Sequence, residues 1–487
     1  IAGIDVPFVL LLLVGSALFF TIYFKFPNIF HFKTAINVVR GKYDELDHAS
    51  VNSELAIDGD IADTIKDESK EGEVTHFQAL ATAVSGTVGN GNIAGVALAI
   101  ALGGPGATFW MVVCGFLGMS TKFVECTLGV QYRDVGEDGT VYGGPMYYIS
   151  KGLKERGFEV FGKITAIIFA IFCIGGSFGG GNAAQSNQAT VVLKELMGLE
   201  STGAGFWIGV IMAIVVGIII IGGIKRIASV TEKVVPFMAV LYLLACLYIL
   251  GANFSLIDDA FSLILREAFN PTAIGVGGVI GVLLVGFKRA AFSNEAGAGS
   301  ASIAHSAVKT KYSASEGLVA LLEPFIDTVV ICTMTALVII IFNFGGDASG
   351  ATIFQYGGDG AGAVLIDGVS YEGAGITSKA FAEYIPYSNV FLTVAVVLFA
   401  VSTMISWSYY GLQSWKFLFG RGKAADMAYK LLFLLFVIIG ASASMNSIWA
   451  FSDAMIFAMV FPNMVGLYFL FPVVKKQLNR YIEAIKS

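Results

Sequence analysis

Long apolar runs recur along almost the whole chain, and they decide what it can fold into. A helix needs about 20 mostly apolar residues to cross a bilayer. We interpret eleven runs as membrane spans, at residues 6–24, 83–100, 108–130, 164–196, 206–221, 234–250, 273–306, 318–342, 390–410, 428–443 and 448–473. Of the 487 residues, 56% are hydrophobic and only 14% are charged, so the sequence predicts an all-α polytopic membrane protein.

The second of these runs contains small and polar residues where a continuous helix would be expected. They are Ser85, Gly86, Thr87, Gly89, Asn90, Gly91 and Asn92. Glycine and asparagine disfavour a helix interior, so the pattern predicts a broken helix. At membrane depth, a break is tolerated only where protein or a water-filled cavity satisfies the freed backbone groups. We therefore interpret the break as a binding site, with a glycine-rich packing face as the alternative.

A second interruption lies around Asn294, in the sequence GFKRAAFSNEAGAGS at residues 286–300. Asn294 and Gly89 are separated by 294 − 89 = 205 positions in the sequence. This separation is half of the roughly 410 residues that follow residue 77. When the first span is set aside, ten spans remain, five in each half. This arrangement predicts an inverted repeat with a substrate site between the paired breaks. Lys288, Arg289 and Glu295 are costly inside a span and are functional candidates, unless the segment is a short cytoplasmic turn.

The order of the segments predicts a domain organisation and an orientation. We expect an additional N-terminal helix at 1–26, an interfacial helix and acidic loop at 27–76, five-helix repeats at 77–252 and 253–473, and a cytoplasmic tail at 474–487. Lysine and arginine concentrate in one set of loops, which predicts an outside N-terminus and a cytoplasmic C-terminus in the cell inner membrane. The acidic loop at 343–388 then lies outside and carries a short helix at 377–384.

Other function classes lack support in the sequence. The five cysteines all lie in apolar runs and the four histidines are scattered, so no metal site is visible. We find no zinc spacing, phosphate loop or nucleophile elbow, and no basic run that would bind nucleic acid. The sequence predicts a transporter rather than an enzyme.

Six motifs resemble the alanine/glycine:cation symporter family, the sodium-coupled alanine symporters. They are GEVTHFQAL at 72–80, VGNGNIAGVA at 88–97, GGPGATFWM at 103–111, GGPMYY at 143–148, FSNEAG at 292–297 and WSYYG at 407–411. The resemblance implies a leucine-transporter-like fold of 5+5 inverted repeats with one extra N-terminal helix. Two positions depart from the family pattern: Asn90 stands where threonine is usual, and Ala290 where glycine is usual.

A zwitterionic amino acid needs a partner at each end. The backbone amides of Gly89, Asn90 and Gly91, together with Thr87, lie at the start of the second half-helix, where the dipole favours a carboxylate. By resemblance, Gln185 is the acceptor for the ammonium group, with helix packing as the alternative. Two aromatic residues, Phe292 and Trp407, resemble the pocket walls of the family, although packing is the commoner role of such side chains.

The resemblance also implies a sodium site, like the second sodium site of the leucine-transporter-like fold. Its ligands would be the carbonyl oxygens of Ser85, Val88 and Phe399 and the hydroxyls of Ser402 and Thr403. Oxygen ligands suit a hard cation such as sodium. The alternative for the two hydroxyls is hydrogen bonding to their own helix.

The predicted function is sodium-coupled symport of a small neutral amino acid, alanine or glycine, by alternating access. The predicted partners are the amino acid, the co-transported sodium ion and the lipid bilayer. A proton-coupled transporter of the same fold, or a member with serine or glutamine as substrate, remains an alternative. Glu125, Glu323 and Asp327 also lie in or near spans, where they would gate, pair with Arg289 or relay protons.

Overall fold

The computed structural model describes residues 7–48, 72–136, 139–199, 201, 203–271, 278–346, 348, 352–357 and 362–487. Most of the predicted acidic loop, and the first residues of the span predicted at 273–306, lie outside these ranges. The described helices up to the middle of the chain are α1 Phe8–Tyr23, α2 Pro27–Phe30, α3 Phe32–Val39, α4 Asp44–His48, α5 His76–Thr87, α6 Val96–Gly103, α7 Gly106–Gln131, α8 Pro145–Glu155, α9 Glu159–Phe178, α10 Ala184–Met197, α11 Ala204–Ile220, α12 Gly223–Ala252 and α13 Ile257–Phe269.

The second half of the chain contains nine more described α-helices. They are α14 Gly278–Asn294, α15 Ala301–His305, α16 Ser313–Ala320, α17 Leu322–Pro324, α18 Thr333–Asn343, α19 Ala374–Tyr384, α20 Ser388–Phe419, α21 Lys423–Ser442 and α22 Met445–Lys486. In the described part of the chain, π-helical segments at Gly91–Gly95, Gly179–Ala183 and Phe325–Cys332 and a 3₁₀ turn at Phe254–Leu256 lie within or between these helices. Two antiparallel hairpins pair β1 Asp134–Val135 with β2 Val141–Tyr142, and β3 Ala363–Ile366 with β4 Val369–Glu372.

The predicted membrane spans are helices in the structure. Among the described residues, seven helices are long and apolar enough to cross a membrane, and the bent pair formed by His76–Thr87 and Gly91–Gly103 is an eighth. Two shorter apolar helices, α1 and α11, and the interrupted pair α14 and α15 account for the remaining predicted runs. The polytopic all-α prediction is confirmed, and the count of eleven is compatible with the structure.

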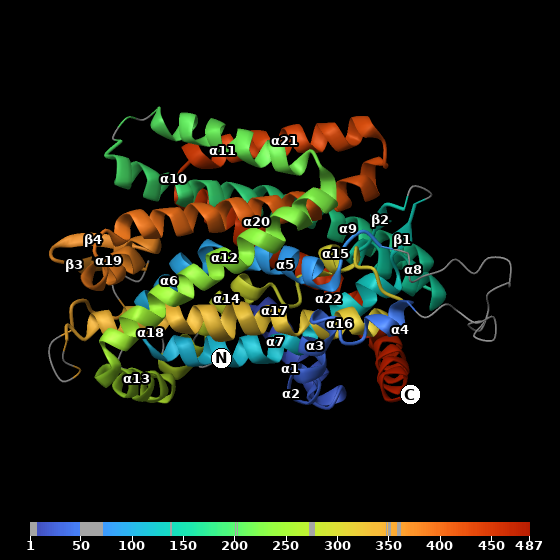
Figure 1. The fold of residues 1–487 in the computed structure, drawn as a ribbon, viewed down its shortest axis with the longest axis horizontal. Helices are drawn as coiled ribbons and strands as arrows, with labels where there is room; N and C mark the ends of the chain where they lie inside the picture. Colours follow the sequence, from blue (N-terminus) through green and yellow to red (C-terminus); the bar gives the residue numbers. More distant parts are fainter. Residues whose placement is uncertain are drawn as a thin grey trace.

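The helices form layers that run along the long axis of the molecule (Figure 1). One layer holds α10, α11 and α21, a middle layer holds α5, α12 and α20, and the opposite layer holds α7 and α14 with α1 beside them. The hairpin β3–β4 and α19 lie at one end, which we call the α19 end. The hairpin β1–β2 and α8 lie at the other, which we call the α8 end. The two broken helices therefore lie between these ends, in the interior.

Some elements differ from the sequence-based expectation. The short helix expected at 377–384 is α19, but the hairpin β3–β4 beside it and the amphipathic helix α13 were not predicted. The span predicted at 164–196 is continuous and contains a π-helical turn at Gly179–Ala183. The final span continues to Lys486, so the predicted tail is helical.

Candidate substrate and ion site

The first break is formed where α5 ends and the chain turns into α6. Val88 has an extended backbone, with ψ of 94°, and the π-helical turn Gly91–Gly95 then leads into α6. The two halves meet at an angle of 52°. The Gly89 backbone N–H donates to Asn92 Oδ1 at 2.9 Å, so the amide side chain of Asn92 stabilises the turn. The predicted break is confirmed.

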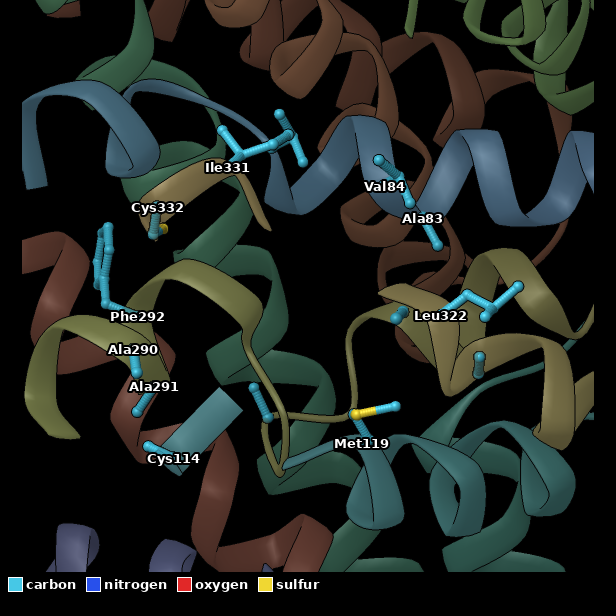
Figure 2. Packing of buried hydrophobic residues seen from close by; sticks show 14 of the residues in the cluster. Ala83, Val84, Cys114, Met119, Ala290, Ala291, Phe292, Leu322, Ile331 and Cys332 are labelled. Carbon is cyan, nitrogen blue, oxygen red and sulfur yellow. The ribbon is translucent and has the colours of Figure 1, made fainter. Parts of the chain in front are cut away.

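The second break follows the last turn of α14. Figure 2 shows Ala290, Ala291 and Phe292 on that turn, just before the chain leaves the helix. The next six residues, 295–300, are not helical, and Glu295 has a positive φ of 53°. The Ala296 backbone N–H donates to Asn294 Oδ1 at 3.0 Å, which holds the turn by which the chain leaves the helix. Both interruptions that the sequence predicted are therefore present.

A small closed cavity lies between the two breaks. The space open to a water-sized sphere is about 10 Å³, about enough for one water. Side chains must therefore move before an amino acid can enter. The cavity is lined by Gly86, Thr87, Gly89, Gly91, Gly180, Gln185, Phe292, Ser293, Glu295, Thr403, Trp407 and Ile456. Six of the seven residues predicted to bind substrate are in this set.

The seventh, Asn90, lies beside the cavity rather than in its lining. Its backbone N–H donates to Gln185 Oε1 at 3.4 Å, while Gln185 Nε2 donates to the Gly180 carbonyl at 3.0 Å. The Asn90 side chain is buried, and within the described residues neither atom of its amide has a hydrogen-bond partner. Gln185 thus joins the first break to the glycine-rich π-helical turn.

The residues predicted to bind sodium lie where α5 crosses α20. The Thr403 hydroxyl donates to the Ser85 carbonyl at 3.1 Å, and the Ser85 hydroxyl donates to the Ser402 carbonyl at 2.7 Å. The Ser402 hydroxyl donates to the Phe399 carbonyl of its own helix at 3.0 Å, which is the alternative role considered above. Val88 is buried at the end of α5. Four of the five predicted ligands are thus joined in one uncharged group of oxygen atoms, the kind of donor set that sodium prefers.

A buried carboxylate, Asp327, connects the two breaks. Its Oδ1 accepts a hydrogen bond from Asn92 Nδ2 at 2.7 Å, and its Oδ2 accepts from the Ser293 and Thr328 hydroxyls at 2.8 and 2.7 Å. Asp327 was considered as a partner of Arg289, but its hydrogen bonds go to these neutral groups instead. The sequence offered no sign of this link, because the residues are far apart in the chain.

At the α19 side of the cavity, aromatic and charged side chains join α14 to α22. The Phe292 and Trp449 rings have centroids 5.2 Å apart. Lys288 Nζ and Arg289 Nη2 lie 3.3 and 3.8 Å from Asp453 Oδ2. These contacts hold the last turns of α14, which carry the lining residue Phe292, against α22. Asp453 was not identified from the sequence, because one acidic residue near a span carries no specific signal.

Comparison with known sequences gives a match over nearly the whole chain. The model of the sodium:alanine symporter family matches residues 3–487. The sodium/alanine symporter AgcS of Methanococcus maripaludis is 38% identical and aligns with 99% of this chain and 95% of its own length. A sodium/proton-dependent alanine carrier protein of Bacillus sp. is 32% identical over 86% of this chain and 91% of its own. A probable sodium/glutamine symporter, GlnT of Bacillus subtilis, is 31% identical over 85% of this chain and 80% of its own.

Comparison with solved structures concerns the fold. The crystal structure of MhsT in complex with L-phenylalanine superposes with a TM-score of 0.54, covering 82% of this chain and 89% of that chain at 16% sequence identity. At this identity the likeness extends to the fold alone. It confirms the leucine-transporter-like architecture expected from the sequence.

Proposed function

Because the chain belongs to the sodium:alanine symporter family, we propose that it is a sodium-coupled symporter of small neutral amino acids, with alanine and glycine as the first candidates. The chain is a membrane transporter and not an enzyme. The observation that carries the proposal is the closed cavity between two broken helices, lined by Gly89, Gly91, Gln185, Phe292 and Trp407.

The chemistry of this lining suits a short zwitterion. Backbone amides of Gly89, Asn90 and Gly91 at the first break would hold the carboxylate, where the dipole of the second half-helix favours negative charge. Gln185 Oε1 would accept from the ammonium group. The aromatic rings of Phe292 and Trp407 would then leave room for a methyl group or a hydrogen atom and exclude longer side chains.

Sodium coupling would act through the contact between α5 and α20. An ion held by the oxygen atoms of Ser85, Val88, Phe399, Ser402 and Thr403 would fix α5 next to the substrate amides. Ordering of the first break by sodium would raise the affinity for the amino acid. By linkage, the amino acid must then raise the affinity for sodium by the same factor.

We place the protein in the cell inner membrane with the N-terminus outside and the C-terminus in the cytoplasm. The basis is the concentration of lysine and arginine in the loops of the α8 end. In this orientation the α19 end faces outward and the α8 end faces the cytoplasm. Cysteine accessibility to a membrane-impermeant reagent, with single cysteines placed at Lys379 and Lys151, would test the assignment.

The deciding experiment is uptake of labelled alanine into proteoliposomes under an inward sodium gradient. A potassium gradient and a pH gradient serve as alternative driving conditions, with unlabelled glycine, serine and glutamine as competitors. We expect sodium-driven accumulation that glycine blocks. Gln185→Ala should raise the concentration of alanine at half-maximal uptake. Gln413→Ala removes a buried glutamine that is not among the cavity-lining residues and that donates to the Val141 carbonyl, and it should leave this value unchanged.

Two results would redirect the proposal. Uptake driven by a pH gradient without sodium would favour a proton-coupled transporter, and the relative named as a sodium/proton-dependent carrier supports testing for it. Stronger competition by serine or glutamine than by glycine would change the proposed substrate to serine or glutamine. One relative is named as a probable sodium/glutamine symporter, which supports including glutamine in the test.

A further inference from the structure

A line of buried charged side chains leads away from the cavity toward the α8 end. It begins at Glu295, which lines the cavity and is 5% exposed. The Ser300 hydroxyl donates to Glu295 Oε2 at 2.5 Å, so this carboxyl is held within the second break. A carboxyl at this place lies where a molecule in the cavity and the backbone of the second break would both be within its reach.

Behind Glu295, α7 contributes a lysine and a second carboxyl. Lys122 Nζ lies 3.0 Å from Glu323 Oε1, and both side chains are completely buried. Glu125 Oε1 accepts a hydrogen bond from Asn463 Nδ2 at 2.7 Å. Lys122 acts electrostatically on Glu125, Glu295 and Glu323 together. The positive charge of this one lysine is therefore shared among three buried carboxyls.

Two histidines continue the line. His305 Nε2 faces Glu323 Oε2 at 3.7 Å, and its other ring nitrogen, Nδ1, is 2.5 Å from Glu316 Oε1. The second oxygen of Glu316 is hydrogen-bonded to His76 Nδ1. His76 is the first residue of α5 and is 8% exposed. It follows the bridge between Val74 and Val308, so the line ends near the surface of the α8 end.

The charges of this line do not balance without bound protons. It holds four carboxyls, on Glu125, Glu295, Glu316 and Glu323, and one lysine. Even with both histidines charged, three positive groups face four negative ones. An uncompensated charge is very costly in a buried site, so at least one carboxyl holds a proton.

Unpartnered atoms inside the line indicate that a proton can take more than one position. Among the described residues, His305 Nε2, Glu323 Oε2 and Glu125 Oε2 are buried and have no hydrogen-bond partner. The distance of 3.7 Å between His305 Nε2 and Glu323 Oε2 is just too long for a hydrogen bond. A small shift of α15 would close this gap and join the two halves of the line.

Other titratable groups interact electrostatically with Glu295 and enter the balance of charge around it. They are Lys122 on α7, Cys173 on α9, Tyr410 on α20, Glu323 on α17 and Asp327 in the π-helical segment Phe325–Cys332. Only Lys122 among them carries a positive charge. Glu295 is thus the carboxyl next to the cavity in a region short of positive charge.

We propose that Glu295 is a proton-binding site of the transport cycle, and that Glu323, His305, Glu316 and His76 exchange its proton with the solution at the α8 end. The inference rests on the proposed amino-acid transport but not on sodium as the driving ion. The ammonium group of an amino acid in the cavity stabilises the ionised form of Glu295, because opposite charges attract strongly where water is excluded. Substrate binding therefore releases a proton, and acid weakens binding.

The test uses the full-length protein in detergent. Alanine is added at saturating sodium in weak buffer with a pH indicator, and its affinity is measured at a series of pH values. The wild type should release a proton on binding, and its Kd should rise up to tenfold per pH unit in the acidic range. In Glu295→Gln both effects should vanish. Glu267→Gln, which removes another buried carboxyl on α13, is the matched control and should behave as the wild type.

Two further variants test the proton path to the α8 end independently of the proton-binding site at Glu295. His305→Gln and Glu316→Gln should keep the amount of proton released and slow its appearance at the α8 end of reconstituted protein. Unchanged release rates in both would overturn the proposed path. Alanine binding by the wild type without proton release, and with the same Kd at every pH, would overturn the proton site while leaving symport intact.

A failure of alanine to bind would contradict the substrate proposal and would not decide the proton site. For that case, infrared difference spectra of a pH jump report the protonated carboxyl directly, without substrate. Loss of a carboxylic acid band in Glu295→Gln supports the assignment. An identical spectrum in wild type and variant overturns it.

Discussion

Asn92 donates a hydrogen bond of 2.7 Å to the Asp327 carboxylate, across 235 residues of sequence. Since Ser293 donates to the same carboxylate at 2.8 Å, the two broken helices are held by one buried group. A change at Asp327 therefore alters the relative position of both halves of the cavity.

Asp327→Asn should lower both stability and transport. An asparagine offers one acceptor oxygen where Asp327 uses two, so at least one buried donor loses its partner, at a cost of about 1–3 kcal/mol. We expect a lower midpoint of thermal unfolding in detergent and uptake reduced more than tenfold. Asp258→Asn, at an exposed position on α13, serves as the control. Uptake at the wild-type level would show that the link between the breaks is dispensable.

Thr403→Ala should weaken the dependence on sodium. The hydroxyl bonds the Ser85 carbonyl at 3.1 Å and belongs to the proposed ion site. Loss of one such interaction, about 0.5–1.5 kcal/mol, predicts a two- to tenfold rise in the sodium concentration at half-maximal uptake. Ser408→Ala removes a hydroxyl of the same helix that donates to the Ile405 carbonyl at 2.6 Å, and should leave this value unchanged. Identical sodium activation in Thr403→Ala and wild type would remove Thr403 from the site.

Asn90→Thr should stabilise the protein. The buried Asn90 amide has no hydrogen-bond partner among the described residues, and an unpaired buried amide costs about 1–3 kcal/mol. A smaller hydroxyl can bond the backbone of its own turn. We expect a higher midpoint of thermal unfolding. Asn187→Thr is the opposite case. Asn187 Nδ2 donates to the carbonyls of Gly440 and Ala443 at 3.0 and 2.9 Å, so the loss of these bonds in the variant should lower the midpoint of thermal unfolding. A lower midpoint for Asn90→Thr would mean that the Asn90 amide is satisfied.

Gly181→Ala should disturb the wall of the cavity. A Cβ atom at this position would lie 2.1 Å from Trp407 Cγ, so the indole must move. Overpacking of this kind costs about 1–3 kcal/mol, and uptake should fall with it. Gly95 lies in the corresponding π-helical turn of the first break and has nothing within 4 Å of such an atom, so Gly95→Ala should be tolerated. Equal uptake by the two variants would contradict the close packing of Trp407.

The sequence predicted the features that depend on local composition. Glycine and asparagine at 89–92 and at 294–299 weaken a helix wherever they occur, and both breaks were found where they were expected. The glycines at 179–181 have the same composition but stay in a helical path. Their neighbours explain the difference, because Trp407, Phe451 and Ile456 fill the space beside them.

Features that depend on distant pairs were not predictable from one sequence. His76 and Glu316 are 240 positions apart, and Lys122 and Glu323 are 201 apart. Each residue alone is compatible with a solvent-exposed loop or an isolated pair. Only the folded arrangement brings them into one line and shows that Asp327, rather than a charged residue of the second break, connects the two halves.

The size of the cavity has a consequence for the sodium gradient of the cell. A pore needs a continuous column of water, whereas the space between the breaks is about enough for one water and is lined by the rings of Phe292 and Trp407. An ion cannot leak through such a barrier, so under the proposed sodium coupling each sodium ion that crosses would require a complete conformational cycle. Electrical recordings should therefore show small currents that saturate with amino acid and no single-channel openings. The gradient would be consumed only in proportion to the nutrient imported.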